Sequence, residues 1–296
     1  MSELAGKGCE IIVPFDERQP LKDIERSIIK KYRKHLWSKF IKAIRDYNLV
    51  EEGDKIAVAI SGGKDSLLMA KMFQELKRHG QVNFEVEFIA MDPGYHKNIK
   101  QLLIDNCEYL DIPIHLFDSR IFEIADEIAK DYPCYMCARM RRGYLYEKAK
   151  ELGCNKIALG HHFDDVIETI LMGIFYGSQV QTMMPRIKST SHPGMELIRP
   201  LYFVKEEDII SWRDKNNLDF IQCACRFTEE YEKNHNEDGK SKREEMKQLI
   251  KKMKEGYDNI DINIFNSVQN VNLDTIISYR KGNEFHHFLE DFRNEG

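Results

Sequence analysis

The stretch AVAISGGKDSLLMAKMF, residues 57–73, passes from an apolar run through a glycine-rich loop into a helical pattern. Its first residues are small, apolar or β-branched, which is typical of a buried strand. From Leu68 onward, apolar residues recur every three or four positions and predict a helix over residues 64–79 with one buried face. A strand that is connected to a helix by a glycine-rich loop indicates a site where a large anion can bind.

The loop SGGKDS, residues 61–66, contains groups that suit phosphate. Glycines let the backbone approach the anion, and the start of a helix offers amide groups and a favourable dipole. Lys64 adds a positive charge, and the two serines can donate hydrogen bonds. The spacing differs from the P-loop GxxxxGK(S/T) and from the dinucleotide motif GxGxxG. We therefore expect Ser61, Gly62, Gly63, Lys64 and Ser66 to bind phosphates, with Asp65 also at the cofactor, because a simple helix cap would need fewer of these residues.

Short apolar runs alternate with helix-length segments over the first two thirds of the chain. The predicted strands lie at 55–60, 83–92, 112–117 and 155–160, and the predicted helices at 64–79, 97–110, 119–130, 138–152 and 164–177. This alternation predicts an α/β fold, a Rossmann-like parallel sheet with helices on both faces. We expect three parts: a basic helical N-terminal arm (1–50), a nucleotide-binding domain (51–225), and a charged loop with C-terminal helices (226–296).

A second strand-to-helix turn, ALGHHFDDVIETILM at 158–172, carries acidic residues. Gly160 permits the turn, and Asp164 and Asp165 fall in the first turn of the next helix. Capping of that helix would explain one aspartate but not both. Because carboxyl ends of parallel strands meet at one sheet edge, we expect Gly160 and His161 at the nucleotide. Asp65, with Asp164 or Asp165, would then bind Mg²⁺.

Four of the seven cysteines form close pairs, Cys134–Cys137 and Cys223–Cys225. An odd count without an export signal indicates metal or redox chemistry in the cytoplasm rather than a disulfide framework. From spacing alone, a Cys₄ zinc site and a redox dithiol both remain open. Arginines follow the first pair, and a helix start with nearby cations would lower the pKa of those thiols.

The charge distribution is uneven along the chain. The net charge is −5, yet residues 26–45, here called the basic segment, contain eight lysines and arginines and no acidic residue. Aromatic residues are interleaved with them, which suits a nucleic-acid backbone, although a solvated helix face would look the same. The mean hydropathy is −0.51, and we expect no membrane span.

In order, the motifs SGGKDS, PCYMCARMRRGYLY, GHHFDD, IFYGSQ and IRPLYFVKEEDI, with a late cysteine, resemble the TtcA family of tRNA 2-thiocytidine synthetases. This family belongs to the PP-loop ATP pyrophosphatases, and the resemblance runs from about residue 36 to about residue 272. It implies a [4Fe-4S] cluster bound by Cys134, Cys137 and Cys223, with one iron open to a sulfide. Cys225 departs from the family's usual CxxC spacing, so its part in the metal site stays open.

The resemblance also implies a reaction. ATP would adenylate the C2 oxygen of cytidine 32 in a tRNA anticodon loop, and sulfur would then displace AMP. The implied catalytic residues are Lys64, Asp65, Asp164, Asp165 and Cys137. One implied partner is the tRNA anticodon stem-loop, which the basic segment would hold together with Arg139, Arg141 and Arg142. The other is a sulfur donor such as a cysteine desulfurase. Whether the protein forms a homodimer stays open.

Three other functions remain compatible with the sequence. A lysidine synthetase would use ATP similarly but would need no iron. A persulfide-type thiolase would use Cys137 as a nucleophile without a cluster. A nucleotide-binding protein with a structural Cys₄ zinc would not turn over ATP.

Overall fold

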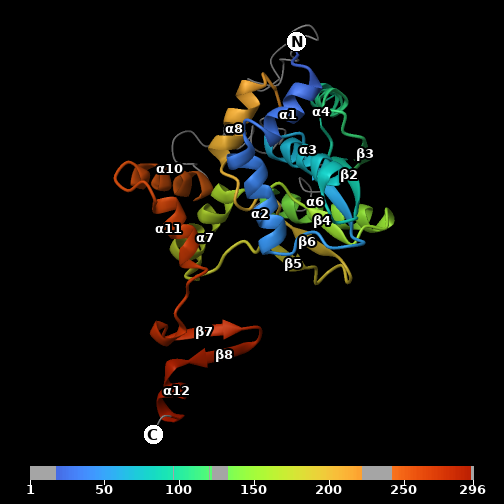
Figure 1. The fold of residues 1–296 in the computed structure, drawn as a ribbon. Coiled ribbons are helices and arrows are strands. Elements are labelled where there is room, and N and C mark those ends of the chain that lie inside the picture. Colours follow the sequence, from blue (N-terminus) through green and yellow to red (C-terminus); the bar gives the residue numbers. More distant parts are fainter. Residues whose placement is uncertain (1–17, 96, 120, 122–132, 222–241, 295–296) are drawn as a thin grey trace. The chain divides into compact units, whose positions relative to one another are not determined.

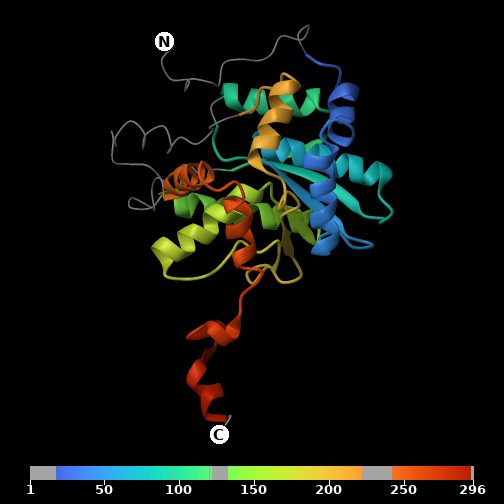
Figure 2. The same cartoon turned by 60° about the vertical axis from the view of Figure 1, so that its left-hand side comes forward.

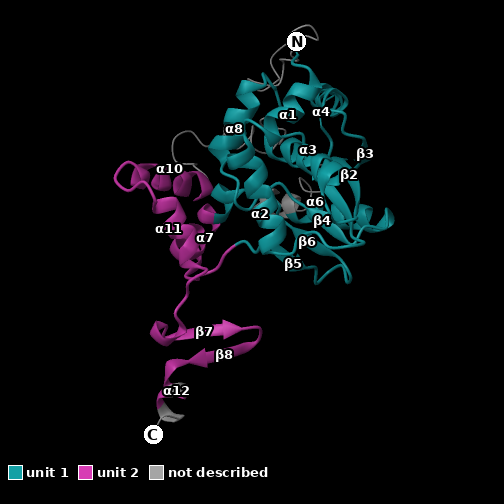
Figure 3. Ribbon diagram, in the orientation of Figure 1, with its two compact units in different colours: residues 1–166, 183–241 teal, residues 167–182, 242–296 magenta. Residues whose placement is uncertain are grey.

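The computed structural model describes residues 18–95, 97–119, 121, 133–221 and 242–294. Two compact units are distinguished in Figure 3: unit 1 lies within residues 1–166 and 183–241, and unit 2 within residues 167–182 and 242–296. No helix in these described ranges is long and apolar enough to cross a membrane.

Unit 1 is built on a six-stranded sheet with the order β3-β2-β1-β4-β6-β5. The strands are β1 (Lys55–Ile60), β2 (Glu85–Asp92), β3 (Ile114–Asp118), β4 (Lys156–Ala158), β5 (Arg186–Lys188) and β6 (Glu196–Ile198). Every neighbouring pair is parallel except β5–β6. The predicted parallel α/β sheet is therefore confirmed (Figure 1). The antiparallel edge strand β5 was not predicted, because three half-exposed residues carry no clear pattern.

Two helices next to the central strand follow from the chain path. Helix α3 (Lys64–His79) leads from β1 to β2, whereas α6 (Pro133–Glu151) precedes β4 on the other side of β1. Because crossover connections are right-handed, these opposite directions along the sheet place the two helices on opposite faces. Tyr146 and Ala149 of α6 pack with Ala57 of β1 and Ile157 of β4 in one buried cluster. Both faces of the central strands are thus covered.

Helix bounds agree with the predictions except at α6. Helices α3, α4 (Lys97–Tyr109) and α7 (Phe163–Gly177) begin within one residue of the predicted positions, and α8 (Glu206–Lys215) follows strand β6. Helix α6 was expected from residue 138 but begins at Pro133, so both Cys134 and Cys137 lie within its first turns. The early start has a physical reason, because proline suits the first position of a helix. Most of the helix predicted at 119–130 lies outside the described residues.

The N-terminal helices belong to the body of unit 1. They are α1 (Leu21–Ile29), the π-helical turn η2 (Arg33–Trp37) and α2 (Ser38–Asp46), and they lie beside α3 and α8 in Figures 1 and 2. Phe40 is fully buried, and its ring meets Phe73 of α3 edge-on with 5.6 Å between centroids. All eight cations of the basic segment are exposed on the opposite side of these helices.

The aromatic residues of the basic segment do not share that exposed side. Tyr32 is only 8% exposed, and its hydroxyl donates a hydrogen bond to the carbonyl oxygen of Ser211 at 2.8 Å. Phe40 lies in the core. The segment therefore presents charge to the solvent, while these two rings hold it to unit 1.

Unit 2 contains most of α7 and the C-terminal elements. These are α10 (Lys242–Lys254), α11 (Ile260–Ser267), the 3₁₀ turn η3 (Leu273–Thr275), the hairpin β7 (Ser278–Lys281) and β8 (Glu284–His287), and α12 (Phe288–Asn294). An ion pair of 3.1 Å between Arg243 of α10 and Glu168 of α7 joins its two chain segments. No strand was assigned at the C-terminus from sequence, because exposed four-residue strands leave little periodic signal.

Candidate active site at the carboxyl edge of the sheet

Two loops meet where the chain direction across the sheet reverses. Strands β1 and β4 are parallel neighbours, with Val58 opposite Ala158, and each is followed at once by a loop and a helix. Open parallel sheets bind ligands outside the carboxyl ends of the strands at such a reversal. The two sequence motifs expected to form one site, SGGKDS and GHHFDD, therefore lie side by side.

The first loop folds back onto the start of α3. The backbone N–H of Ser61 donates to the hydroxyl oxygen of Ser66 at 3.1 Å, and that hydroxyl donates to the carbonyl oxygen of Gly63 at 2.9 Å. Gly62 has φ of +84°, a conformation that favours glycine. Within the described chain no side chain caps α3. The amide groups of its first turn thus point at an open end, as an anion site requires.

The second loop touches the first through backbone alone. A Cβ atom on Gly160 would lie 3.2 Å from the backbone nitrogen of Ser66 and 3.3 Å from the carbonyl carbon of Asp65. A side chain there would push the two loops apart. Gly160 therefore fixes the distance between the phosphate loop and the start of α7.

Asp164 and Asp165 make different contacts, which indicates different roles. Asp165 lines the cavity, and its Oδ2 accepts a hydrogen bond from the backbone N–H of His162 at 3.0 Å. Asp164 instead accepts from the backbone N–H of Glu206 at 2.7 Å and so caps helix α8. The sequence left open which aspartate joins Asp65, and the cavity lining favours Asp165.

A compact group of charges surrounds the start of α3. The Lys64 ammonium lies 3.2 Å from Asp65 and 3.0 Å from Glu206, and His162 Nε2 lies 4.0 Å from Asp65 Oδ1. Burial raises the pKa of Asp65, against the opposing effect of His162 and Lys64. Burial alone would lower the pKa of Lys64, but the carboxylates of Asp65 and Glu206 outweigh it and raise that pKa. Lys64 is therefore firmly cationic. Glu206 lies in the motif IRPLYFVKEEDI but was given no role from sequence, because its partner Lys64 is far away along the chain.

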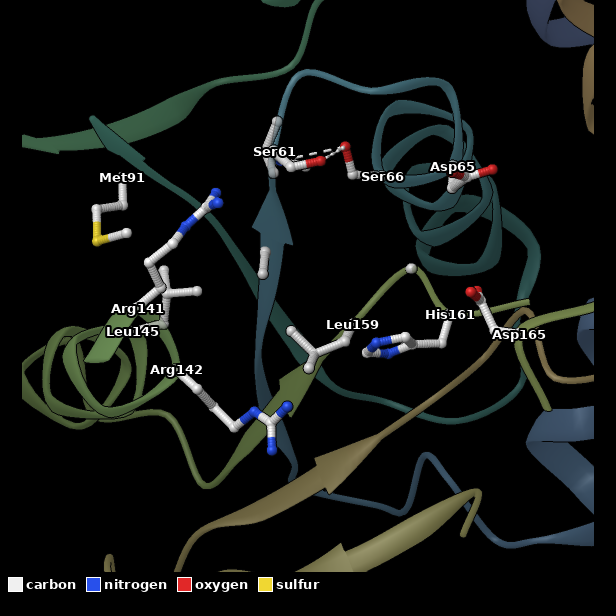
Figure 4. A pocket seen from close by; sticks show the side chains of 13 residues that line it. Ser61, Asp65, Ser66, Met91, Arg141, Arg142, Leu145, Leu159, His161 and Asp165 are labelled. Carbon is white, nitrogen blue, oxygen red and sulfur yellow. Dashed lines mark hydrogen bonds between the residues drawn. The ribbon is translucent and has the colours of Figure 1, made fainter. Parts of the chain in front are cut away.

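The loops open into a cavity of about 370 Å³. Figure 4 shows its walls: Ser61 and Ser66 on the phosphate loop, His161 and Asp165 on the second loop, and arginines on α6. Met91, Leu145 and Leu159 add an apolar surface. A cavity with a polar anion cradle on one side and apolar side chains on another suits a nucleotide.

Most of the predicted nucleotide-binding residues come together here. The cavity is lined by Ser61, Asp65, Ser66, Gly160, His161 and Asp165, with Gly62, Gly63 and Lys64 in the same loop. Asp65 Oδ1 is buried and accepts no hydrogen bond within the described chain, although the Lys64 ammonium lies 3.2 Å from it as an ion-pair partner. An acidic oxygen left in this state, with Asp165 across the same cavity, fits a magnesium ion that also binds substrate phosphates.

The predicted cluster residues lie only partly within the described structure. Cys134 and Cys137 are in the first turns of α6, and the side chains of residues 133–138 lie outside the described part, as does Cys223. Among the side chains that are described, no group of three or more histidine, cysteine or acidic residues forms a metal site. One contact is informative: the backbone N–H of Ile221 donates to the carbonyl oxygen of Gly62 at 3.2 Å.

The chain is similar to known proteins over most of its length. The PP-loop domain family matches residues 32–236. A tRNA-cytidine(32) 2-sulfurtransferase of Paraburkholderia xenovorans is 33% identical over 275 residues, which cover 90% of this chain and 78% of its own. One from Alcanivorax borkumensis is 34% identical over 257 residues, covering 83% of this chain and 84% of its own.

A solved structure shows the same fold. The U34-tRNA thiolase NcsA from Methanococcus maripaludis, with its [4Fe-4S] cluster, matches with a TM-score of 0.61. The two sequences are 22% identical, and the match covers 83% of this chain and 78% of the other.

Gly62 and Gly53 provide a matched test of the phosphate loop, because both have positive φ, +84° and +81°. Gly62→Ala would place its Cβ 2.5 Å from Cδ1 of Ile221, whereas nothing lies within 4 Å of that position at Gly53. We expect both variants to lose about 1–2 kcal/mol of unfolding free energy from backbone strain. Only Gly62→Ala should also weaken ATP binding, measured by calorimetry. Equal ATP affinity in the two variants would contradict a phosphate role for this loop.

Proposed function

The chain belongs to the PP-loop family of tRNA-cytidine(32) 2-sulfurtransferases, and we propose how its residues carry out ATP-dependent thiolation of C2 in that cytidine. The expected family, fold and activity are thereby confirmed. One observation carries the assignment of roles: the phosphate loop, the acidic loop and the middle of the helix that begins with the CxxC pair line a single cavity.

The reaction begins at an oxygen that is a poor leaving group. The C2 oxygen of the cytosine attacks the α-phosphorus of ATP, and pyrophosphate departs. The amides at the start of α3, with Ser61 and Ser66, would bind the departing phosphates, and Lys64 would neutralise part of their charge. Sulfur then attacks C2 and AMP leaves with the former C2 oxygen.

Asp65 and Asp165 would hold the magnesium ion that accompanies ATP. The two carboxylates come from different loops and line the same cavity, so they would hold the ion there beside the phosphates. Such an ion stabilises charge on the phosphates as pyrophosphate leaves. His161 lines the cavity beside these carboxylates and would contact the nucleotide.

The cysteines would bind a [4Fe-4S] cluster beside this cavity. Helix α6 carries Cys134 and Cys137 in its first turns and Arg141 one turn later, at the cavity wall. Ile221 is hydrogen-bonded to the phosphate loop, and Cys223 comes only two residues after it in the sequence. Support thus comes from residues near the three cysteines in sequence, because Arg141 lines the cavity and Ile221 contacts the phosphate loop. When bound, the cluster would supply an open iron site for the sulfur that is transferred.

The tRNA would lie across the positive surfaces of unit 1. The exposed cations of the basic segment suit phosphates of the anticodon stem. Anticodon-loop bases can be splayed out, so the target base would enter the cavity in the flipped state. A sulfur donor such as a cysteine desulfurase would reload the site after each turnover, and a homodimer is compatible with this arrangement.

The rival functions differ in their use of cysteine. A lysidine synthetase has no need for cysteines at the cavity. The relatives described above are named 2-sulfurtransferases and not lysidine synthetases. A persulfide mechanism needs Cys137 but not Cys223. A structural zinc site would use Cys134, Cys137, Cys223 and Cys225 equally.

Lys64→Ala tests the phosphate loop in the reaction itself. Without the ammonium group, pyrophosphate release and tRNA thiolation should both fall at least about 100-fold, because charge on the phosphates is no longer neutralised. Lys77→Ala, an exposed change in the last turn of the same helix, is the control and should behave as wild type. Near-normal thiolation by Lys64→Ala would remove the proposed role.

The RNA surface is tested by neutralising Lys30, Lys31, Arg33 and Lys34 together to glutamine. Binding of an unmodified anticodon stem-loop should weaken, and the slope of log affinity against log salt should become shallower. The control replaces four exposed cations of unit 2, namely Lys251, Lys252, Arg280 and Lys281. If both variants change the slope equally, the basic segment has no special part in RNA binding.

The cluster assignment is tested by separate replacement of the late cysteines. Anaerobically prepared protein should be brown with about four irons per chain. Cys223→Ala should lose iron and activity, whereas Cys225→Ala should keep the cluster and much of the thiolation. Colourless protein with one zinc, lost equally in both variants, would falsify the cluster and favour Cys₄ zinc.

A further inference from the structure

Arg199 is a buried cation next to the wall of the cavity. It directly follows β6, and the residue before it, Ile198, accepts a hydrogen bond at 3.0 Å from the backbone N–H of Leu159, which lines the cavity. The side chain is 5% exposed. Arg199 thus lies at the carboxyl edge of the sheet, one residue from the proposed active site.

The guanidinium of Arg199 has no carboxylate within ion-pair distance among the described residues. In that part of the chain it donates one hydrogen bond, from Nη1 to the carbonyl oxygen of Met184, and its Nε has no hydrogen-bond partner. A buried charge without an opposite partner is costly, and folded proteins rarely retain one for stability alone.

Arg186 on the adjacent β5 shows the usual arrangement. Its side chain lies 2.7 Å from Glu51 and 2.7 Å from Glu196, and these carboxylates raise its pKa. The pKa of Arg199 is instead lowered to about 10, by burial first and then by the charge of Arg142. Tyr202, Tyr146 and Asp165 act in the opposite sense but only in part. Arg199 stays charged at neutral pH and remains uncompensated.

Arg142 brings a second positive charge to the same place. It lines the cavity from α6, and Figure 4 shows it reaching toward β4, while Arg141 extends toward the loop of Ser61. Arg142 is exposed and has no ion-pair partner among the described residues. The charge of Arg142 acts on Arg199, and neither guanidinium forms an ion pair with a carboxylate among the described residues. Together they raise the positive potential at this wall of the cavity.

We propose that Arg142 and Arg199 form a phosphate subsite at the carboxyl edge of β6, separate from the glycine-rich loop. Arg142 contacts the phosphate, and Arg199 acts behind it as a buried charge that solvent screens little. The inference rests on the proposed function, because that function brings two kinds of phosphate into the cavity. One is the phosphate of the nucleotide, and the other is the backbone phosphate beside the target cytidine.

The experiment uses Arg199→Met, with Arg186→Met as the matched control. Unfolding by urea is measured without ligand, and affinities are measured for a non-hydrolysable ATP analogue with Mg²⁺ and for an unmodified anticodon stem-loop. Arg199→Met should be at least as stable as wild type, yet it should bind one of the two probes about 10-fold more weakly or worse. Arg186→Met should show the reverse, with lower stability and unchanged affinities.

The probe that is affected identifies the phosphate. Weaker binding of the ATP analogue alone assigns the subsite to the nucleotide. Weaker binding of RNA alone, with a salt slope reduced by about one, assigns it to the RNA backbone. Arg142→Met should weaken the same probe, and the double variant should lose less than the sum of the two single changes.

Two results would overturn the subsite. One is a loss of stability, including failure to fold, in Arg199→Met. The other is wild-type affinity for both probes. Arg199→Lys, which keeps the charge, should retain most of the affinity of whichever probe is affected. Thiolation by the wild-type protein is assayed in parallel, so a failure of the proposed function would be seen separately from a failure of this inference.

Discussion

The site depends on the absence of a side chain at Gly160. Strands β1 and β4 are hydrogen-bonded neighbours, so the loops that follow them must share one narrow space. At Gly160 the second loop passes the backbone of Asp65 and Ser66 at a distance that leaves no room for a methyl group without displacement. This close approach brings an aspartate from each loop to one cavity. The anion cradle and its acidic counterpart therefore form a single unit rather than two independent turns.

A second contact joins the residues around 221 to the phosphate loop. Ile221 donates a backbone hydrogen bond to Gly62 and packs against it, so residues far apart in sequence end beside the phosphate loop. Helix α6 reaches the same cavity from the opposite face of the sheet. In a parallel sheet, any chemistry that needs cysteines and phosphates together must be assembled in this way, because no single segment carries both.

The sequence predicted which segments form the site but not how the charges are shared. Strand and helix periodicity located β1, α3, β4 and α7, and the glycines marked the turns. Pattern alone could not distinguish Asp164 from Asp165, since adjacent residues at a helix start look alike. Their roles separate only in three dimensions, where α8 begins beside Asp164. The role of Glu206 could not be predicted for a different reason, because its partner Lys64 lies on another helix far away along the chain.

The two sides of the cavity differ in charge, and this difference suits an adenylation reaction. Carboxylates of Asp65 and Asp165 lie on the loop side, where a magnesium ion would offset them, whereas arginines of α6 lie on the opposite wall. A phosphate chain lying between an ion and arginines would be polarised from both sides. The basic residues of the N-terminal helices are exposed instead, where they can bind RNA without disturbing this balance. In the proposed mechanism, the charged groups that line the cavity would act on the nucleotide, and the exposed cations of the N-terminal helices would act on the RNA.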